Sequence, residues 1–310
     1  MALFESAGAE DVRVVEGQPN RRSFGERLRA LLSGLPEGAG LVVLGSGSIP
    51  LAKSRDAADL LAVAASGERR ALANNRYSAD VIAIGAASAL ASVPDLASDN
   101  GFPRWLEEEA QLQVDDLRRR WRLAIDLDSP LDVVLTGGAP EGIDASAVGE
   151  RLEGVHGVAA DRRAELVVAG RTSAGTLRWL ERKTASRTRA LVEERGLRAT
   201  GLGPARPPRS TLGMVLDDRG PESLGPILAE LGDAALVDTR VLLAHRLGAD
   251  EAGWPAPEDR YASDLLLAGQ VRDPWLRALT ASARDSAIPV LLGGHTLVGP
   301  GVRLVLGQRS

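Results

Sequence analysis

Polar side chains that can do chemistry follow the apolar stretches of the C-terminal half. Asp238 and Arg240 come directly after the predicted strand Ala234–Val237. His295 follows the predicted strand Ile288–Leu292. In open α/β sheets ligands bind outside the carboxyl ends of the strands, so these three side chains are the candidate catalytic residues. His295 is suited to act as a general acid or base, and Arg240 to hold a phosphate or a carboxylate.

Further residues of the C-terminal half extend this candidate site. Gly293 and Gly294 precede the histidine and let a ligand approach the backbone closely. Arg171 lies in a strand-to-helix turn, GRTSAG, and can join them. Asp259 and Asp264, in PEDRYASDLL, are candidate metal ligands, although their spacing matches no zinc motif. The alternative is an ion-pair network of Asp and Arg side chains, with the histidine in a turn.

The N-terminal half contains a turn of small residues between an apolar and an amphipathic stretch, LVVLGSGSIPL. Small residues before a helix leave backbone N–H groups available to an anion. The turn matches neither the dinucleotide-binding nor the P-loop pattern, so ordinary turn chemistry is the alternative. The candidate cofactor-binding residues of this half are Gly45, Ser46, Gly47, Ser48 and Asn75.

Carboxylates in the same half form a candidate cation site. Asp126 and Asp128 alternate at the end of the predicted strand Leu123–Ile125, so they should point the same way. Such a pair can hold a divalent cation, and Asp80 can add a third carboxylate. The alternative is that Asp128 and Ser129 cap the helix that follows them.

The elements that must position these residues alternate between strands and helices. This order predicts an α/β fold with a parallel sheet in each half. The predicted strands are Leu41–Leu44, Arg70–Asn74, Asp80–Ile84, Leu123–Ile125, Glu165–Ala169, Ala234–Val237 and Ile288–Leu292. The predicted helices are Ser23–Leu35, Asp56–Ala65, Pro103–Arg120, one that Ser129 and Pro130 open, and Gly175–Arg195.

The chain has 310 residues, a length that favours two domains. The stretch Gly137–Ser146, GGAPEGIDAS, is rich in Gly, Ala and Pro and is typical of a connector. We therefore expect one α/β domain over residues 1–140 and a second over residues 147–310.

Composition excludes several classes of function. The net charge of −5 argues against general nucleic-acid binding, which needs a basic surface. The absence of cysteine excludes disulfides, Cys-ligated zinc and thiol catalysis. The first residues lack the layout of a signal peptide, and no apolar run reaches the ~18 residues of a membrane helix. We expect a cytoplasmic protein without membrane or nucleic-acid partners, and a homo-oligomer is compatible with the sequence.

Four stretches of the N-terminal half resemble small nucleotidyltransferases of the GT-A-like, Rossmann-like fold. The resemblance is greatest to the 2-phospholactate guanylyltransferases and the molybdenum-cofactor nucleotidyltransferases. LVVLGSGSIPL is similar to their strand ending in an Asp-x-Pro-Leu metal corner, and LAIDLDSPLDVVL to their Asp-x-Asp-Thr-Pro-x-Asp-Leu segment. ALANNRYSADVIAI and FPRWLEEEA resemble the strand–turn–strand and the helix between them. The likeness extends over Gly38–Thr136.

The resemblance implies transfer of a nucleotidyl group from an NTP to a phosphorylated small molecule, with Mg²⁺ held by Asp126 and Asp128. Two departures bear on this activity. Ser48 stands where the family has a metal-binding aspartate, and Mg²⁺ prefers carboxylates. The family's Gly-rich nucleotide loop would precede these motifs, and Ala2–Val15 does not contain it. We therefore expect a truncated and divergent domain of this type, in which the fold is retained better than the catalytic residues.

Three hypotheses of function follow. The first is a nucleotidyltransferase-like protein that binds a nucleotide, with Mg²⁺ as its cofactor. The second is an enzyme of the C-terminal half that acts on a phosphorylated or carboxylated metabolite through Asp238, Arg240 and His295. The third is a metabolite-binding protein without catalysis.

Overall fold

The computed structural model describes residues 2–15, 22–32, 35–36, 38–96, 99–194 and 207–307. The chain divides into two compact units, one ending at Asp126 and one beginning at Leu127. We call them the first and the second unit, and describe each by itself. Their boundary precedes the Gly137–Ser146 connector, because Leu131 and Leu135 already belong to a hydrophobic core of the second unit.

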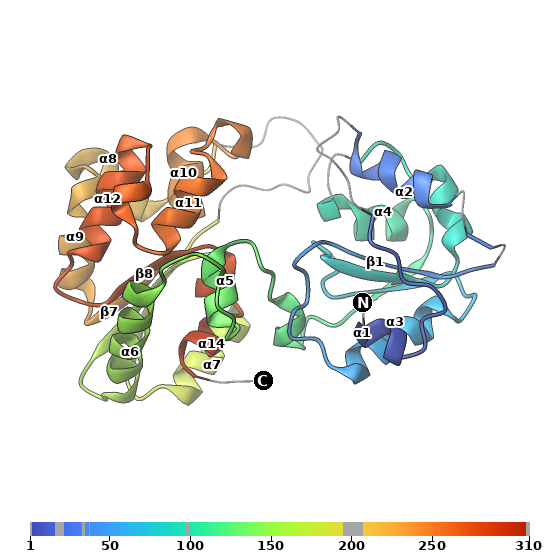
Figure 1. Cartoon of the computed structure of the whole chain (residues 1–310), viewed down its shortest axis with the longest axis horizontal. Helices are drawn as coiled ribbons and strands as arrows, with labels where there is room; N and C mark the ends of the chain where they lie inside the picture. Colours follow the sequence, from blue (N-terminus) through green and yellow to red (C-terminus); the bar gives the residue numbers. More distant parts are fainter. Residues whose placement is uncertain are drawn as a thin grey trace. The chain divides into compact units, whose positions relative to one another are not determined.

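The first unit contains a four-stranded sheet in the order β1-β3-β2-β4. Figure 1 labels β1 of this sheet and the helices α1 to α4 around it. The inner strand β3 runs antiparallel to both of its neighbours, and the other inner strand, β2, runs parallel to β4. The sheet is therefore mixed, which corrects the parallel sheet expected for this half. The strands are β1 (Leu41–Leu44), β2 (Arg70–Ala73), β3 (Val81–Ile84) and β4 (Gln113–Asp116).

Helices cover both faces of this sheet because successive strand residues point to opposite sides. Ile82 and Ile84 of β3 pack in one core with Leu28 and Leu106. Val81 and Ala83, on the opposite face of the strand, pack in another core. The helices are α1 (Ala2–Ser6), α2 (Phe24–Leu32), α3 (Ser54–Ala64) and α4 (Phe102–Glu108). Short 3₁₀ helices are η1 (Ala87–Ser92), η2 (Asp99–Gly101) and η3 (Trp121–Ala124).

Two elements predicted for the first unit are wrong. The helix expected over Pro103–Arg120 ends at Glu108, and strand β4 begins at Gln113. Gln111 separates them with a φ of 54°, which a right-handed helix cannot contain. The strand expected over Leu123–Ile125 is a 3₁₀ turn, η3, that ends at Ala124.

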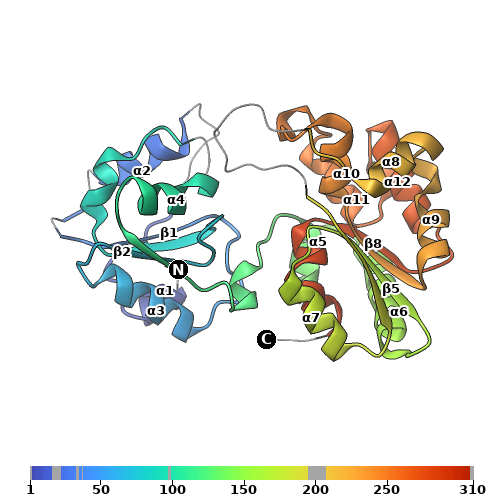
Figure 2. The same cartoon turned by 180° about the vertical axis from the view of Figure 1, so that it is seen from behind.

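The second unit contains a parallel sheet in the order β6-β5-β7-β8. Figure 2 labels its strands β5 and β8. From β5 the chain first goes to β6 on one side and then crosses to β7 on the other. The strand order therefore reverses between β5 and β7, which is where open α/β sheets bind ligands. The strands are β5 (Glu165–Gly170), β6 (Arg187–Val192), β7 (Ala234–Asp238) and β8 (Val290–Gly293).

Helices cover both faces of the parallel sheet, and each face has its own hydrophobic core. Leu166 and Val168 of β5 face one core, and Val167 and Ala169 face the other. The helices are α5 (Pro130–Leu135), α6 (Ser146–Ala160), α7 (Ala174–Lys183), α8 (Thr211–Arg219), α9 (Leu224–Leu231), α10 (Thr239–Leu247), α11 (Pro257–Asp264), α12 (Pro274–Arg284), α13 (His295–Val298) and α14 (Val302–Val305). The 3₁₀ helices are η4 (Pro221–Ser223), η5 (Glu251–Gly253) and η6 (Ala268–Gln270).

One helix of this unit was predicted too long. The stretch Gly175–Arg195 forms α7 only as far as Lys183, and β6 follows as an edge strand. Thr184 is already extended, and Arg187–Val192 pairs along its whole length with β5. Pairing with a neighbour far away in the sequence therefore overrides the local helical pattern.

The α/β class expected from the sequence is confirmed, with one mixed and one parallel sheet. Among the residues that the structure describes, every helix falls short of the length and apolar character that a bilayer span requires.

Candidate functional site

The candidate site lies at the carboxyl edge of the parallel sheet in the second unit. Arg171 follows β5, Asp238 ends β7, and Gly294 and His295 follow β8. Parallel strands bring their carboxyl ends to one edge, so loops distant in the sequence meet here. Arg171 and Asp238 also flank the point where the strand order reverses. We call Arg171, Asp238, Arg240, Asp264 and His295, with Gly293 and Gly294, the switch-point site.

Arg171 and Asp238 form a bidentate ion pair across the switch point. Arg171 Nε donates to Asp238 Oδ2 at 2.6 Å, and Nη2 donates to Oδ1 at 3.1 Å. Gly170 permits this approach, because a Cβ atom there would lie 2.3 Å from Asp238 Cβ. Its φ of +135° is also open mainly to glycine. Gly170 therefore belongs to the architecture of the site.

A second buried ion pair links α10 to α11. Arg240 donates from both Nη atoms to the two carboxylate oxygens of Asp264, with 2.7 Å between Nη2 and Oδ2. Arg240 Nη1 also donates to Thr239 Oγ1 at 2.9 Å, and the Arg240 backbone N–H donates to Asp238 Oδ1 at 3.1 Å. Asp264 is fully buried. The pair fixes the direction of the Arg240 guanidinium.

The electrostatic environment differs between the two carboxylates. Burial would raise the pKa of Asp238, but Arg171, Arg240 and His295 outweigh burial and hold this pKa below its ordinary value. Burial raises the pKa of Asp264, and Arg240 offsets only part of that increase. Asp238 is therefore the stably ionised carboxylate of the site.

The two guanidinium groups approach each other at Gly294. A Cβ atom on Gly294 would lie 3.8 Å from Arg240 Nε and 4.0 Å from Arg171 Nη2. The neighbouring His295 is exposed. A small ligand at Gly294 would thus meet two arginines held in place by buried carboxylates, next to an imidazole at the surface.

The sequence assigned no role to Asp132, which the structure places beside this network. Asp132 is 2% exposed, and its electrostatic neighbours include Asp264 and Arg240. Burial and the carboxylates of Asp264 and Asp128 raise its pKa to about 7. The local signal, Ser129 three residues ahead of Asp132, indicates only a helix cap, and that cap is present.

The predicted metal ligands of the second unit have other partners. Asp264 is bound by Arg240 through both oxygens, and Asp259 accepts a hydrogen bond from the Asp273 backbone N–H at 2.8 Å. Within the described ranges no group of three or more His, Asp or Glu side chains is placed to hold a metal ion. Asp264 is thus an ion-pair partner of Arg240, as the alternative from the sequence expected.

A second constellation in this unit resembles a hydrolytic triad by residue type. Ser210, His245 and Asp217 are connected, but the Ser210 backbone N–H, not its hydroxyl, donates to His245 Nδ1 at 3.1 Å. The Ser210 hydroxyl donates to Glu193 at 2.5 Å, and Ser210 is fully buried. His245 Nε2 lies 2.9 Å from Asp217 Oδ2. This geometry caps α8 and offers no nucleophile.

In the first unit the small-residue turn lies beside Asp126. Ser48 forms an isolated antiparallel bridge with Asp126, and the Ile49 N–H donates to the Ile125 carbonyl at 3.2 Å. The Gly45 N–H donates to the Asp80 carbonyl at 3.0 Å. Two stretches that carry the nucleotidyltransferase resemblance are therefore neighbours in space. We call Gly45, Ser48, Asp80 and Asp126 the Ser48 corner.

The Ser48 corner does not fit a Mg²⁺ ion. Ser48 supplies a hydroxyl where a carboxylate is expected, and Asp80 Oδ2 accepts a hydrogen bond from Asn74 Nδ2 at 2.8 Å. Asp126 and Asp128 do not share a strand, because the expected strand is the 3₁₀ turn η3. Asp128 belongs to the second unit, where its N–H donates to Asp132 Oδ2 at 3.0 Å. The strand that was expected to align these two carboxylates is therefore a 3₁₀ turn.

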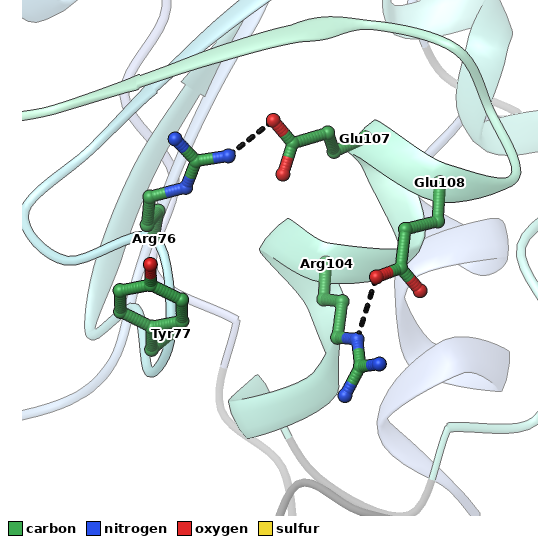
Figure 3. A pocket seen from close by; sticks show the side chains of 5 residues that line it. All are labelled: Arg76, Tyr77, Arg104, Glu107 and Glu108. Carbon is green, nitrogen blue, oxygen red and sulfur yellow. Dashed lines mark hydrogen bonds and ion pairs between the residues drawn. The ribbon is translucent and has the colours of Figure 1, made fainter.

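The turn between β2 and β3 carries Asn75 and an exposed tyrosine. Asn75 Oδ1 accepts a hydrogen bond from the Tyr77 N–H at 3.1 Å, so its side chain shapes the turn. A shallow hollow of about 270 Å³ lies next to Tyr77, and Figure 3 shows that two ion pairs line it. They are Arg76–Glu107 and Arg104–Glu108. Two guanidinium groups and two carboxylates therefore line the hollow.

Comparison with known proteins found no matching family model, curated protein or solved structure. The candidate functions therefore depend on the geometry of the two sites described above.

Proposed function

We propose that the second unit is an enzyme domain that binds a small phosphorylated or carboxylated metabolite at the switch-point site. The observation that carries this proposal is the convergence of Arg171 and Arg240 at Gly294, beside the exposed His295. These groups come from loops after three parallel strands. A ligand that touches all of them is held at the position where α/β sheets commonly bind substrates.

The chemistry of the side chains favours an anion. A guanidinium group has five N–H donors, and pairing with a carboxylate engages only part of them. Buried Asp238 and Asp264 orient the two arginines, so little side-chain entropy is lost when the ligand binds. In this proposal Arg171 and Arg240 hold the anionic group, and His295 exchanges a proton with the bound metabolite.

Replacing Gly294 by alanine is expected to weaken anion binding by about tenfold or more, because the methyl group contacts both guanidinium groups where the anion would bind. The fold should tolerate the change, since the added Cβ makes contacts of 3.8 Å and 4.0 Å, which are ordinary van der Waals distances. The measurement is isothermal titration calorimetry of the full chain with sulfate, inorganic phosphate, pyrophosphate and small carboxylates.

The matched control is Gly157→Ala on α6, where an added Cβ meets nothing within 4 Å. This variant should bind every anion as the wild type does. Equal affinities for wild type and Gly294→Ala, or no binding to either, would rule out the switch-point site as the anion site.

The second candidate function is nucleotide binding by the first unit. The observation that favours it is the Ser48–Asp126 bridge, which joins the two most informative stretches of the nucleotidyltransferase resemblance. Nucleotidyl transfer to a phosphorylated acceptor remains part of this candidate. Because the Ser48 corner does not fit Mg²⁺, its residues favour nucleotide binding without nucleotidyl transfer.

Replacing Ser48 by aspartate is expected to create Mg²⁺-dependent nucleotide binding, because it adds a carboxylate beside Asp126. The measurement is thermal unfolding with each NTP, with Mg²⁺ or with EDTA, since a ligand of the native state raises the melting temperature. Ser46→Asp is the control, because Ser46 is an exposed residue of the same turn. If Ser48→Asp and Ser46→Asp respond alike, the Ser48 corner is not a nucleotide site.

A further inference from the structure

The two carboxyl oxygens of Asp132 are in very different environments. Oδ2 accepts hydrogen bonds from the Asp128 N–H at 3.0 Å, from the Ser129 N–H at 2.8 Å and from the Ser129 hydroxyl at 3.1 Å. Oδ1 is buried and has no hydrogen-bond partner within the described part of the chain. A buried polar atom of this kind costs free energy unless something else satisfies it. Oδ1 therefore needs a partner that the described residues do not supply.

The charges around Asp132 favour its protonated form. Burial is the largest cause that raises the pKa of Asp132, and the carboxylates of Asp264, on α11, and Asp128 add to it. Arg240 and the Ser129 hydroxyl oppose them. Arg240 directs both Nη atoms at Asp264, and it affects the pKa of Asp132 less than either of the two carboxylates does. Since Oδ2 is occupied by three donors, a proton on Asp132 resides on Oδ1.

We propose that Asp132 is a further ligand-binding residue of the switch-point site, and that it donates a hydrogen bond to the anionic ligand from Oδ1 as a carboxylic acid. This inference rests on the proposed function, because it requires an anion at Arg240. An anion there adds negative charge close to Asp132 and strengthens its hold on the proton. The site thus takes up its ligand together with one proton from solution. The proposed ligand is therefore an anion that has one further oxygen to accept a hydrogen bond from Asp132, besides the oxygens that the arginines bind.

Calorimetry with sulfate tests the proposal, because sulfate does not titrate near neutral pH. Titrations at pH 7.5 and 8.5 in buffers of different ionisation enthalpy give the number of protons taken up. His295→Gln serves as the background, so that the imidazole does not contribute. We expect proton uptake by His295→Gln, and an affinity that falls by up to about tenfold per pH unit above pH 7. In Asp132→Asn/His295→Gln we expect retained binding without proton uptake, because the amide is a permanent donor.

Asp128→Asn in the same background is the matched control. It removes a neighbouring charge but leaves the proton-carrying group, so its proton uptake should persist. Equal uptake with and without Asp132 would overturn the inference while leaving the proposed function intact. Absence of sulfate binding in every variant, including the wild type, would overturn both.

A second measurement covers the case in which the asparagine variant does not fold. Carbon-13 NMR of Asp carboxyl groups in the wild type follows protonation directly. We expect sulfate to increase the protonated fraction of one buried carboxyl at pH 7.5. An unchanged carboxyl spectrum in the presence of saturating sulfate would contradict the inference.

Discussion

Replacing Arg240 by methionine is expected to lower the free energy of unfolding of the second unit by about 3–5 kcal/mol. The substitution leaves Asp264 fully buried without the guanidinium that binds both of its oxygens. It also removes one of the positive charges that lower the pKa of Asp238. Uncompensated buried charge is among the few causes of effects this large.

Hydrogen exchange of peptides from β7 and β8 measures this loss within the second unit alone. Arg284→Met is the control, because the Arg284–Asp285 pair is exposed, and it should change stability by less than about 0.5 kcal/mol. The double change Arg240→Met/Asp264→Leu should recover most of the loss, since no charge then remains buried. If the amide hydrogens of β7 and β8 exchange in Arg240→Met at the same rate as in the wild type, Asp264 has another counterion.

The stability of the second unit is expected to fall as pH rises from about 4 to about 8, and Asp132→Asn should abolish this part of the dependence. The pKa of Asp132 is raised from 3.8 to about 7 by burial and by two nearby carboxylates, which corresponds to about 4 kcal/mol. A carboxyl with a raised pKa stabilises the native state fully below its unfolded pKa and loses that contribution as pH passes its folded pKa. The decrease should therefore be complete slightly above pH 7.

Urea unfolding of the wild type and Asp132→Asn across this pH range, read from β7 and β8, measures the effect. The variant should match the wild type near pH 4 and be more stable at pH 8. The pKa of Asp238 is lowered, so its contribution to stability changes only below about pH 4. The pH dependence that Asp132 causes is therefore separate from that of Asp238. Asp128→Asn should move the decrease to lower pH without removing it, because it takes away one repelling charge. Parallel stability curves for wild type and Asp132→Asn would show that Asp132 stays ionised.

Apolar runs bounded by turn residues predicted most strands correctly. Leu41–Leu44 is a strand with these bounds, and β5, β7 and β8 lie within a few residues of their expected positions. In β5, β7 and β8 these runs are buried almost throughout, as continuous apolar strands of a parallel sheet are expected to be. The errors fall on polar stretches. β4 and β6 contain charged residues, and the apolar residues in these stretches lie at helical spacing. Both are edge strands.

Local pattern cannot decide such edge strands because their stabilising hydrogen bonds come from a partner strand. Arg187–Val192 gains its hydrogen bonds from β5, and Gln113–Asp116 from β2. The mixed sheet of the first unit has a different cause. Only residues 74–80 join β2 to β3, which is too short for the crossover that parallel neighbours need, so β3 runs antiparallel to β2.

By itself, the sequence predicted that three of the residues of the switch-point site lie at one edge of the sheet. Asp238, His295 and Arg171 follow separate strands, and parallel packing brings the ends of such strands to one edge. Only the tertiary structure decided the charge state of that edge. It paired Arg240 with Asp264 from another helix and buried Asp132 beside them. Ion pairing and burial depend on distances between segments far apart in the chain, and those distances exist only after the core has packed.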